Sequence, residues 1–540
     1  MENNILHFLS IISDTAKIVV KKKWKQDTCR NGAWLRKFHG KIPLDMDVVI
    51  KKTNASTKKN LSWHSWKQER TMEWLLNTFH FTFENMLIIQ NPYGMVPLSS
   101  MLVFETDETC MVEYIVRGRT EERNFSYRTK TFSRRHMIPV LGLYAAGRNV
   151  VDVTLYSEEM KRMEHRSLTI VTNTLPNRLQ NIVSPDQKMR GRKHELMMVT
   201  GGIKGYTYAF DRDGAVRWYL ARLPRQYGVY LLDHGRFMYP ERKINSPTYI
   251  NPHSNVMYEM DFMGRVYEVF HVSGGIHHCL TPRPGTESEW GREVLAAASS
   301  LRFRMEDEII CYDTARGEIL EKWDLGQFFP QKYLKRKDWA HLNALSCCDR
   351  DHVLISLRNL HTIAKLDLAA NEILWVAAPQ DMYEGTELES KMLKPEGEDF
   401  HYFFQQHAVE ILHRDQQKET MSVLIFDNHC TTKRKSRYYD GRQESYGCLY
   451  QIDEREKKIR TVFAIPCELS PTRSNVHVEP DRESVFTMAG SADSSEFYDC
   501  AYISEWNPQN GELLSKYTVS EGFFRAFPID PMKYLTEEKR

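Results

Sequence analysis

The sequence predicts an all-β protein: a six-bladed β-propeller preceded by a small β-sandwich and a partly helical N-terminal segment. Two observations lead to this fold class. Beyond about residue 166, six segments share one form, in which an apolar strand ends in Asp or Asn, a short polar turn follows, and a second strand begins. Before them, between about residues 86 and 156, short strands with alternating apolar residues follow one another closely.

The first part of the chain, residues 1–85, carries one clear signal. Between residues 66 and 79, apolar side chains recur at the spacing of one helix face, at Met72, Leu75, Leu76 and Phe79. This spacing predicts a helix. We assign this part of the chain no function.

Residues 86–165 are predicted to form the small β-sandwich. Four runs have the alternating or apolar character of strands: MLIIQ, MLVFET, CMVEYIVRG and NVVDVTLY. About five strands at this close spacing are typical of a sandwich. We interpret this domain as structural.

Residues 166–540 are predicted to form the propeller. The turn residues of the six repeats are spaced by 50, 52, 54, 86 and 54 positions, the long spacing marking an insertion at residues 380–402; these turn residues are Asp211, Asp261, Asp313, Asp367, Asp453 and Asn507. Repeats of about 50 residues are typical of four-stranded propeller blades, which bury their faces against neighbouring blades. Two runs are candidates for the strand that closes the ring, GFFRAFPID near the C-terminus and LTIVTNTL near Leu168.

Composition excludes several classes of partner and compartment. The net charge of +2 favours neither nucleic acid nor an anionic membrane as a partner. No stretch approaches the roughly 20 apolar residues that span a bilayer, and the N-terminal apolar run has no preceding positive charge, unlike a secretory signal. We therefore expect a cytoplasmic protein. Ten cysteines in 540 residues are too few for a disulfide scaffold, so free thiols are expected.

Histidines recur at one position of the repeat. His341, His407 and the pair His277 and His278 stand at or near the start of a strand, and Arg358 ends the strand that returns beside His341. The start of one strand and the end of the next lie at the same edge of a hairpin, so His341 and Arg358 are predicted neighbours. Because the first strand of each blade lines the central channel, these side chains are expected to form one cluster.

Two chemistries suit such a cluster. Three imidazoles and a water are a known zinc arrangement. A fixed cation at Arg358 opposes a zinc ion unless carboxylates compensate, and the nearest carboxylate candidate, Asp427, lies one blade away. An oxyanion site is the alternative, because the planar guanidinium matches phosphate or sulfate oxygens. We therefore predict no metal.

The motifs NPYGMVPLSSMLVFET, GGIHHCL, DWAHLNAL, LISLRNLHTIAKLD, QQHAVEIL and FDNH, in this order, resemble the bacterial arylsulfate sulfotransferases, which do not depend on PAPS. The resemblance covers about residues 89–524. It implies a six-bladed propeller behind a small β-sandwich, with no cofactor. It also implies transfer of a sulfuryl group from an aryl sulfate donor to a phenol acceptor, by a ping-pong route through a sulfated histidine.

The resemblance assigns roles by position. His407 in QQHAVEIL corresponds to the nucleophile, while His341 in DWAHLNAL and Arg358 in LISLRN correspond to the residues that hold the sulfuryl oxygens. One of the pair His277 and His278 completes the pocket and handles the phenolic proton; we favour His278. Three further residues are expected to bind the substrate: His277, Asn343 and Asn428.

Two alternatives belong to other classes. A non-catalytic propeller would bind a protein or an anionic ligand at its channel mouth, and would tolerate His407→Gln. A metal-dependent hydrolase or lyase would use the same histidines, and metal analysis would reveal it. The phenols themselves are not fixed by the sequence, and a homodimer is compatible with the resemblance.

Overall fold

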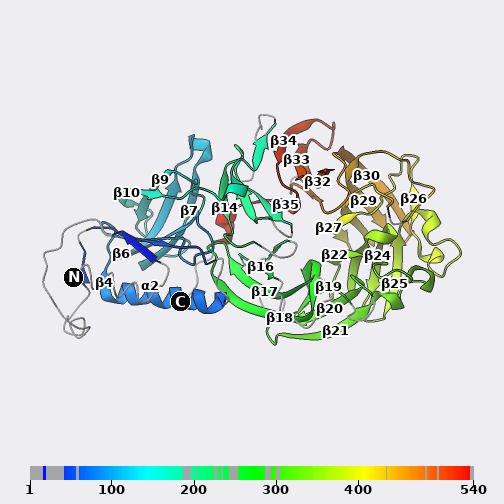
Figure 1. The fold of residues 1–540 in the computed structure, drawn as a ribbon, viewed down its shortest axis with the longest axis horizontal. Helices are drawn as coiled ribbons and strands as arrows, with labels where there is room; N and C mark the ends of the chain where they lie inside the picture. Colours follow the sequence, from blue (N-terminus) through cyan, green and yellow to red (C-terminus); the bar gives the residue numbers. More distant parts are fainter. Residues whose placement is uncertain are drawn as a thin grey trace.

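The computed structural model describes residues 16–19, 42–44, 46–55, 60–186, 196–202, 205–223, 228–232, 235–241, 253–285, 293–299, 304–432, 434–480, 483–495 and 498–535. Figure 1 shows the N-terminal sheet and its helix on one side and the later sheets, coloured green to red, on the other. Strands dominate both parts, so the prediction of an all-β protein with a propeller-like arrangement is confirmed. In the described part of the chain, no helix is both long enough and apolar enough to span a bilayer.

The N-terminal region holds an eight-stranded sheet. The first half of its long strand β6 pairs with β5 and β8, and the second half pairs with β7 and β9, so two half-sheets share this strand. The last strand, β10, runs past residue 165, at which we predicted that the small β-sandwich ends. The strands are β1 (Ala16–Val19), β3 (Val48–Lys52), β5 (Leu87–Gln90), β6 (Ser100–Val116), β7 (Phe125–Arg128), β8 (Ser133–Val140), β9 (Arg148–Tyr156) and β10 (Arg162–Val171).

The predicted N-terminal helix is confirmed as α2 (Leu61–Thr78), although it begins five residues earlier than the apolar pattern indicated. Asn60 caps it, because its side chain accepts a hydrogen bond from Trp63 N at 2.9 Å. The helix packs on the rest of the fold through its apolar face, and Ser65 Oγ accepts a hydrogen bond from Val266 N at 3.0 Å. The parallel pair β2 (Ile42–Pro43) and β4 (Phe79–His80) lies next to the end of the helix. The other helical turns among the described residues are 3₁₀: η2 (Glu121–Arg123), η3 (Asn177–Leu179), η4 (Leu325–Gln327), η5 (Gln331–Tyr333), η6 (Arg358–Leu360), η7 (Gln380–Met382), η8 (Glu389–Lys391) and η9 (Pro531–Tyr534).

Five sheets form the propeller-like part. Two contain strands from both ends of the region: β11 (Val183–Pro185) with β31 (Asn475–Val478), β32 (Val485–Ser495), β33 (Tyr498–Trp506) and β34 (Leu513–Val519); and β12 (Leu196–Gly201), β13 (Tyr208–Phe210) and β14 (Val216–Tyr219) with β35 (Phe523–Ile529). One has seven strands: β15 (Tyr230–Leu231), β16 (Arg236–Glu241), β17 (Ser254–Asp261), β18 (Val266–Pro282), β19 (Glu293–Ala298), β20 (Glu308–Asp313) and β21 (Glu318–Asp324). The last two are β22 (Leu342–Cys347), β23 (His352–Leu357), β24 (Thr362–Asp367) and β25 (Glu372–Ala377); and β26 (Lys394–Glu396), β27 (His407–Asp415), β28 (Thr420–Asp427), β29 (Ser445–Asp453) and β30 (Lys458–Cys467).

The six predicted hairpins are present, and their turn residues have one shared role. In each hairpin the Asp or Asn side chain accepts a hydrogen bond from at least one backbone N–H group of its own turn, as Asp313 does from Ala315 N at 2.8 Å and Arg316 N at 3.0 Å. The paired strands are β13 with β14, β17 with β18, β20 with β21, β24 with β25, β29 with β30 and β33 with β34.

The prediction of six separate blades is wrong. Among the described residues, four sheets have the four or five strands of a blade, and the fifth has seven. The reason is β18, which continues for 17 residues, pairing first with β17 and then with β19. Two predicted repeats are therefore joined by one strand.

Strand β35 closes the ring. It pairs with β12, so the C-terminal run GFFRAFPID takes this place, whereas the run near Leu168 belongs to β10 in the N-terminal sheet. Asn475 fastens β35 to β31, because its amide donates to Ala526 O at 2.7 Å and accepts from Ala526 N at 3.0 Å.

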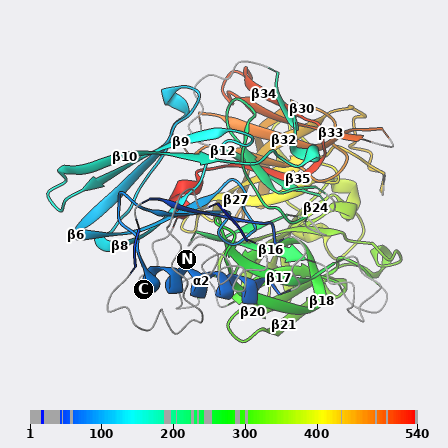
Figure 2. The ribbon, with the colours of Figure 1, turned by 60° about the vertical axis from the view of Figure 1, so that its left-hand side comes forward.

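The N-terminal sheet and the first propeller-like sheet lie side by side (Figures 1 and 2), and their buried apolar side chains form one core. The fully buried Arg217 crosses between them and donates from Nε to Gly142 O at 2.9 Å, while Nη1 pairs with Asp211 at 2.8 Å. Both parts of the chain therefore hold each other in place.

Candidate functional site

His407 opens β27 and is almost fully buried. Its Nδ1 lies 2.7 Å from Asn428 Oδ1, and the amide nitrogen of Asn428 donates to Ser470 O at 2.6 Å. The amide oxygen of Asn428 is thus an acceptor, so the hydrogen of His407 sits on Nδ1. The neutral ring therefore keeps an unshared electron pair on Nε2.

The backbone around His407 is held in a strained form. Gln405 and Ala408 adopt left-handed conformations, with φ of 52° and 57°. Such conformations cost free energy in non-glycine residues and persist where surrounding contacts enforce them. Here Gln405 N donates to His361 Nδ1 at 3.0 Å, and Asn343 Nδ2 donates to Gln406 O at 2.8 Å. These contacts fix the start of β27.

Arg358 lies where the hairpin predicted. Its backbone N donates to His341 O at 3.2 Å, so the predicted neighbours are confirmed as neighbours. The guanidinium is buried and donates from Nη2 to Pro471 O at 3.3 Å, while Nε has no hydrogen-bond partner in the described part of the chain. A buried guanidinium with an unused donor and no salt bridge among the described residues is suited to bind an anion.

His341 is a charged imidazole. Its Nδ1 lies 2.6 Å from a carboxylate oxygen of Glu306 and 3.0 Å from one of Asp338. Burial opposes a charge on the ring, but the two carboxylates outweigh it and raise the pKa of His341 to about 9. At neutral pH this ring therefore carries two N–H donors, and Nδ1–H is used by the carboxylates.

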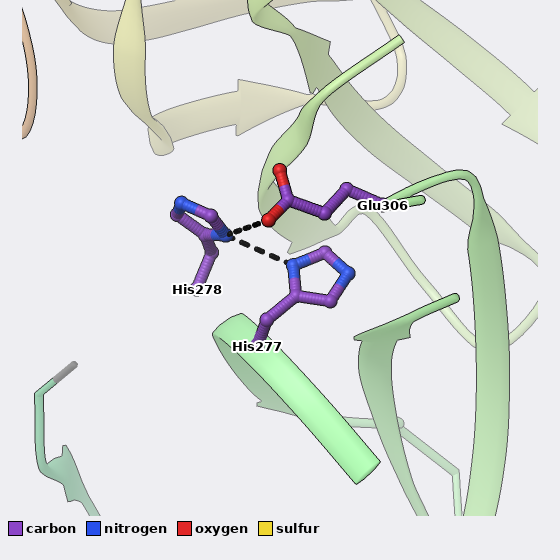
Figure 3. A group of neighbouring side chains, drawn as sticks. All are labelled: His277, His278 and Glu306. Carbon is purple, nitrogen blue, oxygen red and sulfur yellow. Dashed lines mark hydrogen bonds and ion pairs between the residues drawn. The ribbon is translucent and has the colours of Figure 1, made fainter. Parts of the chain in front are cut away.

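His277 and His278 form a chain of hydrogen bonds (Figure 3). His277 Nε2 lies 2.9 Å from Ala298 O and must donate to it, so its Nδ1 accepts from His278 Nδ1 at 2.9 Å. The unshared electron pair of His278 is then on Nε2. Burial lowers the pKa of His277 to about 4 and that of His278 to about 3, so both rings are neutral.

Four of the predicted residues come together. The rings of His278 and His341 lie 5.1 Å apart. Burial first, and then the nearby charges of Arg358 and His341, hold the pKa of His407 well below its usual value. These four residues therefore form one cluster of two neutral imidazoles, one charged imidazole and one guanidinium.

The other three predicted site residues occupy a layer behind this cluster. We expected His277, Asn343 and Asn428 to bind the substrate. In the structure His277 binds His278, Asn343 donates to the backbone before His407, and both polar atoms of the fully buried Asn428 amide are engaged with protein groups. Asn343 Oδ1 has no hydrogen-bond partner among the described residues, and substrate binding by these three residues stays a prediction.

Glu306 is the main residue that the sequence analysis missed. It lies between two imidazoles, 2.6 Å from His341 Nδ1 and 3.9 Å from His278 Nδ1. Burial opposes its charge, but His341 and His278 hold its pKa well below the usual value. Glu306 lies two residues before β20, outside the first strands of the repeats, so the repeat position did not mark it. The sequence analysis also missed Asp338, which lies three residues before His341 and contacts its ring.

Three aromatic side chains flank the site motifs without entering the site. Trp339, Phe403 and Phe404 are buried, and Trp339 Nε1 donates to Asp307 at 3.2 Å. Phe404 packs against the rings of His361 and His429. These residues pack the interior.

A second group of polar side chains lies behind Asn428. Asp427 is fully buried and accepts hydrogen bonds from His401 Nε2 at 2.9 Å and His429 Nδ1 at 2.8 Å. His429 Nε2 in turn lies 2.8 Å from Asp440. The sequence marked Asp427, but not its two histidine partners.

The ligand atoms of three histidine–carboxylate groups lie within 4.8 Å of one another: His277, His278 and Glu306; Glu306, Asp338 and His341; and His401, Asp427 and His429. In each group, neighbouring atoms approach to between 2.6 and 2.9 Å. Two ligands of a tetrahedral zinc ion with bonds of about 2.0–2.2 Å lie farther apart, at about 3.3 Å. The geometry therefore fits hydrogen bonds better than metal ligation.

A cavity of about 590 Å³ lies away from the histidines. It is lined by side chains of α2, the N-terminal sheet and the β17–β18 hairpin, including Glu73, Tyr127 and Arg265. It shares no residue with the histidine cluster, so its size does not bear on the chemistry of that cluster.

The chain matches two protein-family models and is similar to a known protein. A family model described as arylsulfotransferase (ASST) matches residues 181–525, and a model described as the arylsulfotransferase Ig-like domain matches residues 87–173. The arylsulfate sulfotransferase AssT of Lelliottia amnigena is 21% identical over 523 residues, covering 75% of this chain and 84% of that protein.

Solved structures give weaker likenesses. A virginiamycin B lyase variant from Staphylococcus aureus has a TM-score of 0.31 and 8% identity, covering 62% of this chain and 98% of its own. The WD40 domain of SCAP from fission yeast has a TM-score of 0.27 and 9% identity, covering 78% of this chain and 84% of its own. Scores this low carry no argument about the site.

Proposed function

This chain belongs to the arylsulfotransferase family, and on that premise we propose that it moves a sulfuryl group from an aryl sulfate to a phenol through a covalent intermediate on His407. The observation that carries the proposal is the state of His407. Its Nδ1–H is bound to Asn428, and its pKa is depressed, so a neutral ring presents Nε2 as a nucleophile.

The neighbouring cations suit the sulfuryl group. An aryl sulfate carries one negative charge, which the guanidinium of Arg358 and the imidazolium of His341 neutralise without a metal. Sulfuryl transfer resembles phosphoryl transfer in placing charge on peripheral oxygens, so fixed donors contribute through positioning and electrostatics.

In the first half-reaction, His407 Nε2 attacks sulfur while the bond from sulfur to the phenolic oxygen breaks. The phenolate leaves with that electron pair and takes a proton. We assign this proton to His341, because an acid must hold its proton at the working pH, and the pKa of His278 near 3 leaves it none to give. This differs from the role that we expected for His278.

In the second half-reaction, an acceptor phenol gives its proton to the now neutral His341 and its oxygen attacks the sulfur on His407. The bond from sulfur to Nε2 breaks, and the electron pair returns to His407. The residue that protonates one phenol thus deprotonates the other, as the reverse of the same step requires. Each half-reaction leaves the enzyme ready for the next.

The turnover experiment uses purified protein and 4-nitrophenyl sulfate, with and without added phenol. We expect release of 4-nitrophenol that depends on the acceptor and is lost in His407→Ala. A folded wild-type protein with no release under either condition would instead favour a propeller that binds an anion at its channel mouth.

A further inference from the structure

We propose that Asp427 and His429 are positioning residues for His407, and that Asp440 connects them to the loop between β28 and β29. This inference rests on the proposed role of His407 as nucleophile. It concerns residues that do not touch the reacting atoms and act through the backbone and through Asn428.

Asp427 joins the two segments that carry the nucleophile and its partner. One of its oxygens, Oδ1, accepts from Phe404 N at 2.7 Å and from His429 N at 2.8 Å. The first contact fixes the segment that leads into His407, and the second fixes the turn that carries Asn428. A single carboxylate oxygen therefore sets how far apart these two segments lie.

The other oxygen of Asp427 is held by imidazoles. Oδ2 accepts from His401 Nε2 at 2.9 Å and from His429 Nδ1 at 2.8 Å. With Oδ1 already engaged, the buried carboxylate makes four hydrogen bonds and cannot rotate without breaking several. The fixed carboxylate of Asp427 therefore holds in position the residues that form the hydrogen bond between Asn428 and His407.

His429 extends the support outward. Both of its ring nitrogens face carboxylates, Asp427 at 2.8 Å and Asp440 at 2.8 Å, so both donate and the ring is an imidazolium. Burial opposes this charge, but the two carboxylates raise the pKa of His429. His429 is 2% exposed. Its two hydrogen bonds link the buried carboxylate of Asp427 to the carboxylate of Asp440 in the loop.

The same loop contacts the start of β27 from another side. Thr432 Oγ1 donates to Gln405 Oε1 at 2.9 Å, and Arg434 O accepts from His361 Nε2 at 3.1 Å. His361 Nδ1 accepts from Gln405 N. The loop thus braces Gln405 directly and through His361, while Asp440 braces Asp427 through His429.

The test measures the first phenol released by each enzyme molecule when no acceptor is present. In stopped flow with 4-nitrophenyl sulfate, the amplitude counts competent sites and the rate constant reports attack by His407. The variants are His429→Gln and the milder Asp440→Asn. The matched control is His352→Gln, since His352 also lies between two carboxylates, Asp349 at 2.7 Å and Asp367 at 3.5 Å, but at the far ends of β23 and β24.

We expect His429→Gln to retain the amplitude while its rate constant falls by about 10²-fold, as misplacement of a reacting group by about 1 Å does. Asp440→Asn should show a smaller fall, and His352→Gln should match wild type.

Folding damage alone would instead lower the amplitude at an unchanged rate constant, which would overturn the proposal. So would wild-type rate constants in both loop variants, or a stoichiometric metal bound at His429. If wild type itself shows no burst, it is the role of His407 that fails.

Discussion

Three imidazoles within one cluster differ in charge because their surroundings differ. His341 faces two carboxylates, His278 faces another imidazole, and His407 faces an amide and a guanidinium. One ring is therefore cationic and two are neutral at the same pH. Groups whose pKa values are pushed apart in this way take separate acid and nucleophile roles.

The first prediction concerns pH. The charge on His341 is present below its pKa of about 9 and is lost as pH rises through that value. Activity should therefore fall on the alkaline side with a midpoint near pH 9. His407 is protonated only well below its usual range, so activity should stay level through neutral pH.

Glu306→Gln tests the cause of this fall in activity at alkaline pH, which is the alkaline limb of the pH profile. The amide keeps the size of the side chain but removes the charge next to His341, so the limb should move to lower pH. At pH 9 the variant should keep about a tenth of the wild-type rate. The measurement is a rate profile from pH 5 to 10, and identical profiles for variant and wild type would contradict the assignment.

The second prediction concerns the leaving group. His341→Gln removes the proton donor, which matters most when the departing phenol is weakly acidic. Release from phenyl sulfate should fall by about 10²–10⁴-fold, and release from 4-nitrophenyl sulfate should fall much less. Equal losses for the two esters would show that His341 does not supply the proton.

Repeat position could predict His341, Arg358 and His407, because each stands at the start or end of a strand in a hairpin, whereas His278 lies inside the long strand β18. Repeat position could not predict Glu306, which reaches the cluster from beside β20 in a left-handed conformation with φ of 55°. Nor could it show that Asn428 faces the protein, since the direction of an amide depends on packing between distant segments.

At the scale of the element, strand β18 shapes the site most. It carries Gly274 and Gly275, with φ of 87° and 77°, immediately before the residues that place His277 and His278. A Cβ at Gly275 would lie 2.9 Å from the Cβ of His253 and 3.0 Å from Ser254 O. The strand therefore turns there only with glycine.

Gly275→Ala should therefore destabilise the protein and disturb the histidine pair. The positive φ costs an alanine about 1–2 kcal/mol whether or not other atoms crowd the added Cβ. At Gly275, overpacking against neighbouring atoms adds about 1–3 kcal/mol. Gly511→Ala is the matched control, because Gly511 has a φ of 71° with no heavy atom within 4 Å of the added Cβ. Denaturant unfolding compares the two, and equal losses of stability would contradict the packing argument.

The hairpins were the most predictable elements. An Asp or Asn at the end of an apolar strand binds its own turn, which is a local interaction that sequence reveals. The helix was predictable for the same reason, from its apolar spacing. The continuity of β18 was not, because a strand that serves two sheets is decided by partners far apart in sequence.

At the scale of the whole molecule, β35 joins the C-terminal strand to β12, and Asn475 holds it. Asn475→Ala leaves the buried N–H and C=O of Ala526 without these partners, at a cost of about 1–3 kcal/mol for each group. The midpoint of thermal unfolding should fall, with Asn173→Ala at an exposed position as the control. An unchanged midpoint would show that the ring does not depend on this contact.

The number of sheets was not predictable from the repeats. Six hairpins lie in five sheets because hydrogen bonding continues through β18. Counting repeats identifies similar segments of sequence. It does not show where hydrogen bonding between neighbouring strands stops, and this is what separates one sheet from the next.

The most direct test of the account is the mass of the peptide that contains His407. Protein mixed with 4-nitrophenyl sulfate without acceptor, then quenched and digested, should show that peptide heavier by one sulfuryl group. Added phenol before the quench should remove the gain. A sulfuryl group on another peptide, or acceptor-dependent turnover with no modified peptide at any time, would contradict transfer through His407.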